Sequence, residues 1–147
     1  MKRLIVFVLI TVLMCVIGMN FVEDFNIGNL FPNAMVEVYI DGKYNENGIY
    51  SIKNGGGSIL FCHTYEVDEL QKKYKVAGFT LKIEKDSVKN VLKKLLADVV
   101  YVENDYIYGR SIYFCNYIQT QCGLANFQCI EEENFILIGT PILLGCY

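Results

Sequence analysis

The chain has 147 residues, a formal net charge of -3 at pH 7 and no tryptophan. A mildly acidic chain lacks the basic balance that neutralises nucleic-acid phosphates, so its composition argues against a nucleic-acid binder. Its length fits one domain of ordinary size, which can build a core without help from disulfides.

The first residues are the most informative part of the sequence. Lys2 and Arg3 precede an apolar run over residues 4–18, and Glu23 and Asp24 follow it. This order is typical of a signal peptide or a membrane anchor. A helix over 4–18 spans about 22 Å and one over 4–22 about 28 Å, against a bilayer core of roughly 30 Å, so cleavage and retention both stay open. We therefore predict a signal peptide or anchor over 1–19, a tether over 20–33 and an extracytoplasmic domain over 34–147.

Hydrophobic alternation predicts three strands at the start of this domain, over residues 35–41, 49–53 and 58–62. Asp41-Gly42-Lys43 indicates a turn after the first of them. The glycine run 55–57 separates the second from the third. Glycine-rich loops that bind phosphate lead into a helix, whereas a strand follows here, so a hairpin turn is the favoured interpretation.

Two helices are predicted next, with a strand over 78–84 between them. The first covers 65–74 and is capped by Thr64. The second begins after Asp86 and carries one apolar stripe. The stripe consists of Val88, Val91, Leu92, Leu95 and Leu96. Lys89, Lys93 and Lys94 fall on the other side, where a solvated face is favoured over a phosphate contact.

The remaining strands are predicted over 98–102, 106–114, 126–130 and 135–138. The last is apolar on both faces, which indicates a central strand. The element order predicts an α+β fold, in which an antiparallel-rich sheet carries two helices on one face. The N-terminal hydrophobic signal or anchor helix precedes this domain.

Cysteine and histidine give little sign of chemistry. Five of the six cysteines lie outside the leader, and an odd number argues against a fully paired framework. If 111–118 and 125–130 form a hairpin around Cys122, Cys115 comes opposite Cys129 and a disulfide is conceivable, although buried free thiols are favoured. His63 is the only histidine; Glu66 or Asp68 would have to orient it for base catalysis. We predict no metal site, no cofactor and no catalytic set.

Tyrosines gather in one region, and Tyr101, Tyr106 and Tyr108 are the candidate contact surface. Tyr106 and Tyr108 should share a sheet face, opposite Ile107. Tyrosine on a sheet face offers large area and a polar tip to a protein or glycan, although it is also an ordinary strand former. Glu103 and Asp105 are interpreted as turn residues, while a pair of carboxylates would suit a glycosidase.

The C-terminal end resembles a known family. Asn126-Phe127-Gln128, Ile138-Gly139-Thr140-Pro141-Ile142 and Tyr147 are similar to the closing segment of the YwmB-like family of Gram-positive bacteria. The resemblance is close over residues 126–147 and implies an exported α+β protein. It carries over no site residues, and the TATA-box-binding label of that family rests on fold similarity, which does not transfer function.

The leading hypothesis is a non-enzymatic extracytoplasmic domain that contacts another envelope protein or a cell-wall polymer. It would meet the membrane through residues 4–22 if the leader is uncleaved. The alternative is a small cell-wall or glycan hydrolase that uses acidic residues. A nucleic-acid binder, by fold analogy, is disfavoured.

Overall fold

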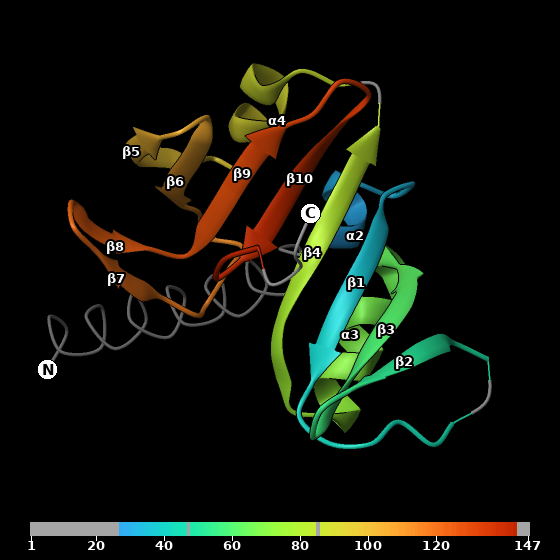
Figure 1. Ribbon diagram of the computed structural model, residues 1–147. Coiled ribbons are helices and arrows are strands. Elements are labelled where there is room, and N and C mark those ends of the chain that lie inside the picture. The colour runs from blue at the N-terminus through green and yellow to red at the C-terminus, as the bar shows by residue number, and fades with distance from the viewer. Residues whose placement is uncertain (1–26, 47, 85, 144–147) are drawn as a thin grey trace, which may run out of the picture.

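The computed structural model describes residues 27–46, 48–84 and 86–143. Its main feature is an eight-stranded antiparallel sheet in the order β2-β3-β1-β4-β10-β9-β6-β5 (Figure 1). The strands of this sheet are β1 Met35–Ile40, β2 Tyr50–Asn54, β3 Gly57–His63, β4 Val76–Glu84, β5 Asp98–Glu103, β6 Tyr106–Arg110, β9 Phe127–Glu131 and β10 Phe135–Thr140. A separate hairpin consists of β7 Ile118–Thr120 and β8 Gly123–Ala125.

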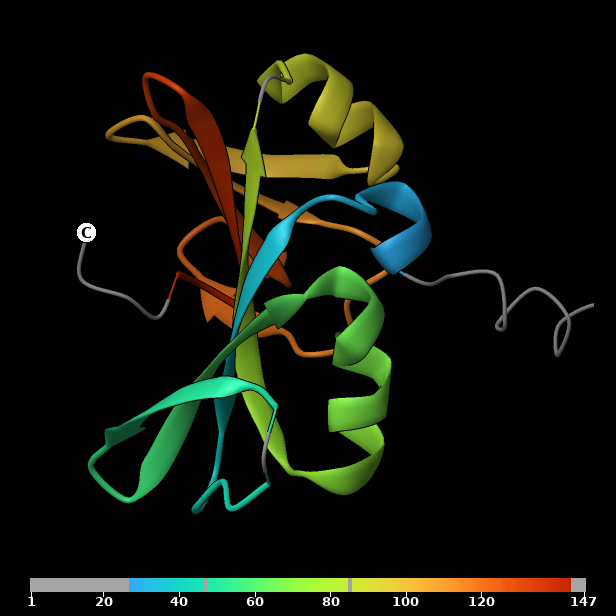
Figure 2. The same ribbon diagram turned by 90° about the vertical axis from the view of Figure 1, so that its right-hand side faces the viewer.

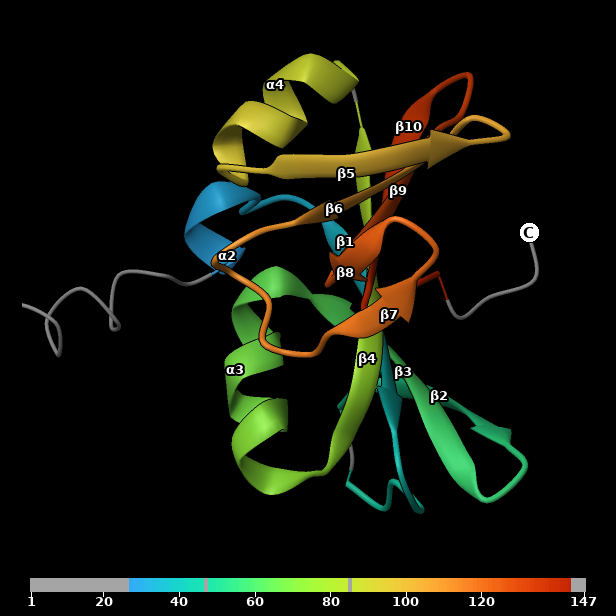
Figure 3. The ribbon, with the colours of Figure 1, turned by 90° about the vertical axis from the view of Figure 1, so that its left-hand side faces the viewer.

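The described helices all lie on one side of the sheet, as the two edge-on views show (Figures 2 and 3). They are α2 Ile27–Leu30, α3 Thr64–Lys73 and α4 Val88–Lys94. The antiparallel sheet with helices on one face is therefore as predicted. The described helices are short, so the sheet dominates the fold. The predicted N-terminal hydrophobic helix lies outside the described residues, and none of the helices within them is long and apolar enough to cross a membrane.

Part of the predicted tether belongs to the core. Residues 27–30 form α2, and Ile27 and Phe31 are both buried. The buried Thr64 hydroxyl at the start of α3 donates to the Phe31 carbonyl over 2.9 Å. Two apolar side chains, at positions 27 and 31, are too few to show a helical period in the sequence. The prediction therefore placed the start of the domain at residue 34. Residues 20–26 of the tether lie outside the described part of the chain.

Strand register divides the side chains between two faces. Val36 pairs with Leu81, Leu81 with Ile138 and Ile138 with Cys129, and all four are buried under the helices. Neighbouring residues on a strand point to opposite faces. The residues directly before and after each of these four on its strand therefore lie on the face that no helix covers. We call this second face the open face. The central position predicted for the 135–138 strand is confirmed, since β10 lies between β4 and β9.

The helix ends differ slightly from their predicted positions. Thr64 is the first residue of α3, and the Glu66 carboxylate accepts from the His63 backbone N–H over 2.8 Å. Ser87 caps α4 in place of Asp86, because its hydroxyl accepts from the Asn90 N–H at 3.3 Å. Leu96 falls outside the predicted stripe: its φ is +48°, so α4 has ended, and its side chain is exposed.

The predicted strand 106–114 is shorter because a buried asparagine fastens the chain after Arg110 into a loop. The Asn126 side chain accepts from the Ser111 N–H at 2.8 Å and donates to the carbonyls of Ser111 and Phe114 at 2.7 Å each. The Ser111 hydroxyl donates to the Leu95 carbonyl over 2.6 Å, which ties the same loop to the end of α4. These bonds replace the ladder that a continued strand would have made.

The cysteine hairpin takes a different form from the one considered above. A turn at Cys122 joins β7 to β8, but β9 pairs with β6 and β10 rather than with residues 111–118. Cys129 is consequently in the core while Cys115 is exposed, so they are not opposite each other. All four described cysteines are free thiols. Burial raises the pKa of Cys62 and of Cys129 to about 12, which makes both inert at neutral pH.

We predict that Asn126→Ala lowers the free energy of unfolding by about 3 kcal/mol in urea denaturation, because three buried backbone groups lose their partner. Asn116→Ala, at an exposed position in the same loop, is the matched control and should change that energy by less than about 0.5 kcal/mol. Equal stability of the two variants would contradict the role assigned to Asn126.

A second prediction concerns alkaline pH. The folded protein keeps the Cys62 and Cys129 thiols protonated up to a pKa of about 12, whereas in the unfolded chain they ionise near 9.0. The unfolded state therefore binds fewer protons above pH 9, and stability falls there by up to about 2.7 kcal/mol per pH unit from the two thiols. Under reducing conditions, Cys62→Ala/Cys129→Ala should show a shallower fall between pH 9 and 11 in urea titrations. Identical slopes would rule out this cause.

Candidate functional site

The open face carries one row of residues that crosses all eight strands. Successive register pairs connect its members. From one sheet edge to the other the row is Tyr50, Phe61, Glu37, Thr80, Gly139, Gln128, Tyr108 and Tyr101. Aromatic rings therefore occupy both ends of the row, and small or polar side chains its centre.

The predicted contact surface lies at the β5–β6 end of this face. Tyr101 and Tyr108 are cross-strand partners whose rings stack at 4.3 Å between centroids with 4° between their planes. Tyr106 lies two residues before Tyr108 on β6 and therefore shares its face, whereas Ile107 packs against the core. The structure thus brings the three tyrosines together. We call Tyr101, Tyr106 and Tyr108 the tyrosine patch.

Neighbouring polar groups hold the tyrosine patch in place. The Gln128 amide donates to the Tyr108 hydroxyl at 2.9 Å, and a salt bridge joins Arg110 to Asp98 on the same two strands. Partial burial and the adjacent Tyr108 raise the pKa of Tyr101 above its ordinary value of 10.0. Because the Tyr101 and Tyr108 rings are already stacked, few of their side-chain rotations need to be frozen when a partner binds.

Residues 141–143 fold back over the open face at Gly139 and Gln128. Thr140-Pro141 is a cis peptide bond, and the Leu143 N–H donates to the Gln128 side-chain oxygen at 3.0 Å. A Cβ at position 139 would collide with the backbone of Ile142 and Leu143, so glycine is required there. Gln128 consequently connects the returning segment to Tyr108.

A shallow groove of about 350 Å³ lies at the centre of the open face. Its apolar walls are Met35, Phe61, Phe135 and Leu137. Its polar residues are Glu37, Thr80 and Lys82, and the Lys82 amine lies 4.3 Å from the centre of the Phe135 ring. The Thr80 side chain is buried, yet its hydroxyl has no hydrogen-bond partner among the described residues. An unsatisfied buried hydroxyl is costly, so it marks this groove as a candidate binding region.

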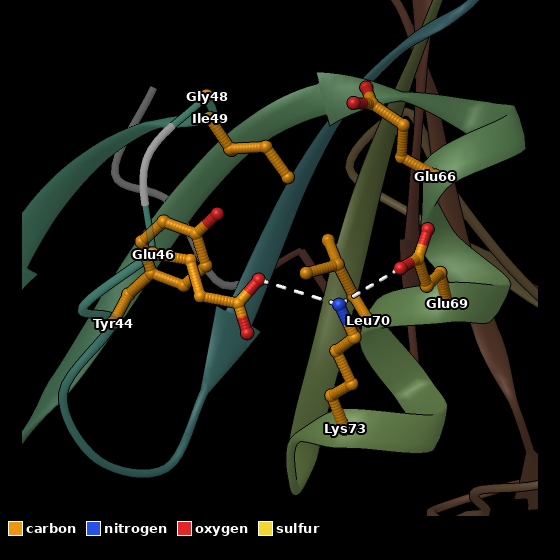
Figure 4. A pocket seen from close by; sticks show the side chains of 8 residues that line it. All are labelled: Tyr44, Glu46, Gly48, Ile49, Glu66, Glu69, Leu70 and Lys73. Atoms are coloured by element: carbon orange, nitrogen blue, oxygen red, sulfur yellow. Dashed lines mark hydrogen bonds and ion pairs between the residues drawn. The ribbon is translucent and has the colours of Figure 1, made fainter.

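A second pocket, of about 200 Å³, contains the carboxylates that a hydrolase would need (Figure 4). Glu46 and Glu69 both point at the Lys73 amine, at 3.5 Å and 2.9 Å. The hydrogen bond from Lys73 lowers the pKa of Glu69, which is the opposite of what a general acid requires. Glu66, the third carboxylate, accepts from the His63 backbone. Two of the three carboxylates thus pair with the lysine, and the third is engaged by backbone.

The other candidate groups stay apart from one another. His63 is exposed and its ring stacks on Tyr65 at 5.6 Å, while Glu66 reaches its backbone and not its ring. Asp105 lies in the turn between β5 and β6, and Glu103 is at the end of β5. Within the described residues no group of three or more His, Cys, Asp and Glu side chains could hold a metal ion.

Sequence reasoning missed Gln128 and Thr80 as parts of the open face. A strand period of two places both on a face, but only the register shows that this face is also that of Tyr108 and Phe61. Comparison of the chain with protein-family models, curated proteins and solved structures finds no match.

We predict that Thr80→Val raises the free energy of unfolding by about 1 kcal/mol, because a methyl group of the same shape replaces an unpaired hydroxyl. Thr64→Val is the matched control, since that hydroxyl is also buried but donates to the Phe31 carbonyl, and its loss should lower stability by about 1 kcal/mol or more. Both variants are compared by urea denaturation. Losses of similar size in both would show that Thr80 has a partner after all.

Proposed function

We propose that this protein is a non-enzymatic extracytoplasmic domain that binds another envelope protein or a cell-wall polymer through the tyrosine patch. The leader at residues 1–19 supports the location, as a basic start and an apolar run direct a chain across the membrane. The domain would be held at the membrane by residues 4–22 or released by cleavage.

The observation that carries the proposal is the stacked Tyr101–Tyr108 pair on a sheet face that no helix covers. Tyrosine and arginine dominate the energetics of protein interfaces, and Arg110 lies beside these rings in a salt bridge with Asp98. Large rings with polar tips bind both apolar side chains and sugar rings. The resemblance to the YwmB-like family agrees with an exported binding domain and remains a prediction.

The hydrolase alternative receives less support. Its carboxylates would be those of the Lys73 pocket, where Glu46 and Glu69 are exposed and paired with the lysine. A glycosidase needs one carboxyl group with a raised pKa, and the pKa of Glu69 moves down.

The test replaces Tyr101, Tyr106 and Tyr108 with serine in the full chain. The matched control replaces Tyr65 and Tyr117, which are exposed tyrosines outside the patch. Binding is measured by cosedimentation with purified cell wall and by crosslinking in intact cells, and thermal unfolding checks that both variants fold. We expect the patch variant to lose at least tenfold in binding and the control to retain it, because ring contacts at the centre of an interface contribute most of its energy.

Retention of both cell-wall and protein contacts by a folded patch variant would refute the proposal. Loss of only one of them identifies the partner. Equal loss in the control variant would show that tyrosine content, and not this patch, is responsible.

A further inference from the structure

The surface of α4 is basic although the chain as a whole is acidic. Lys89, Lys93 and Lys94 are all exposed on this helix, whereas the formal net charge of the chain is -3. Lys94 pairs with Asp86 over 2.7 Å, while Lys89 and Lys93 form no salt bridge with any described residue. The helix therefore presents positive charge that its own neighbours do not neutralise.

Two large apolar side chains are exposed at the C-terminal end of α4. Leu96 follows α4 with 61% of its surface exposed, and Ile112 follows β6 with 58% exposed. The hydrogen bond from the Ser111 hydroxyl to the Leu95 carbonyl, at 2.6 Å, brings these two segments together. Exposed apolar groups beside lysines are the composition of surfaces that bind the headgroup region of a bilayer.

The described chain begins beside the same surface. Helix α2 starts at Ile27 and lies next to α4 in the helix layer (Figures 2 and 3), and the Lys94 amine is 5.5 Å from the centre of the Phe31 ring. An apolar anchor over 4–22 leaves residues 23–26 as the connection, whose greatest extension from residue 22 to residue 27 is about 17 Å. A domain of this size is about 35 Å across, judged from its expected radius of gyration of about 13 Å. So short a connection keeps the α2–α4 side nearest the membrane.

We propose that α4 and the adjoining Leu96 and Ile112 rest on the anionic surface of the lipid bilayer that holds the chain. Lys89 and Lys93 contact the lipid phosphates, and the two apolar side chains enter the headgroup region. This inference rests on the membrane-held form of the proposed function. It directs the open face, which lies on the other side of the sheet, away from the bilayer and toward the space where envelope partners lie.

The sequence contains no tryptophan, so a single substitution supplies a site-specific fluorescent probe. Ile112→Trp and, as the control on the open face, Tyr50→Trp are placed separately in the full chain and reconstituted into vesicles of neutral lipid with 30% phosphatidylglycerol. Quenching by brominated lipid chains reports contact with the bilayer. We expect quenching at position 112 that disappears in neutral vesicles or at high salt, and none at position 50.

The charge contribution is tested in the Ile112→Trp background. Lys89→Gln/Lys93→Gln should lower the ratio of docked to undocked domains about thirtyfold, given the usual contribution of a lysine near an anionic surface. Lys43→Gln/Lys53→Gln changes the net charge equally at exposed positions near β2 and should leave quenching intact.

The outcomes separate this inference from the function on which it rests. If the protein floats with the vesicles but position 112 is not quenched, or if position 50 is quenched equally, the inference is overturned and the anchor stands. Equal loss of quenching in both lysine variants would overturn the role of α4. If the protein does not float with vesicles of any composition, the anchor fails and the inference fails with it.

Discussion

The register between β4 and β10 determines what each face of this protein presents. Leu81 pairs with Ile138, and both are fully buried beneath the helices. Since side chains alternate along a strand, the same register places Thr80 and Gly139 on the open face. A slip by one residue would send Lys82 into the core, which is far more costly than any single contact in the sheet. Burial of the apolar core therefore determines the strand register, and the register in turn determines which residues lie on the open face. The open-face residues themselves contribute little to the register.

Consecutive residues around the start of β9 join three parts of the structure. Asn126 fastens the loop after β6, Phe127 fills the space above Gly109, where a Cβ would overlap its ring, and Gln128 connects Tyr108 to the returning C-terminal segment. Neighbouring residues on the strand point to opposite faces, so none of these three side chains could make the contacts of the one beside it. Residues 126–128, which belong to the segment with the family resemblance, thus have structural roles.

The parts of the fold that follow from local periodicity could be predicted from the sequence. The strand over 35–41 and the central strand after Phe135 appear where the hydrophobic pattern placed them, because burial of one or both faces dictates that pattern. The loop after Arg110 could not be predicted, because Asn126 acts on it across 15 positions of sequence and no local pattern records such a bond. Likewise, the sequence placed Tyr106 and Tyr108 on one face, but the stacking on Tyr101 depends on the irregular β5–β6 register, with its shift between Val99 and Tyr101.

The open face departs from the rules that govern the rest of the domain. Met35, Tyr50 and Ile52 remain exposed on it, and Thr80 keeps a buried hydroxyl without a partner among the described residues. On the other side of the sheet the helices cover the central apolar side chains, and the buried hydroxyls of Thr64 and Ser111 are both bonded. A buried hydroxyl without a partner beside exposed apolar side chains is typical of a surface kept for a partner, because a sequence shaped by stability alone would have made this face polar. A domain whose covered side carries the basic helix α4 and whose other side carries aromatic rings has two surfaces of different chemistry. The sheet between them holds those surfaces in a fixed relation to each other.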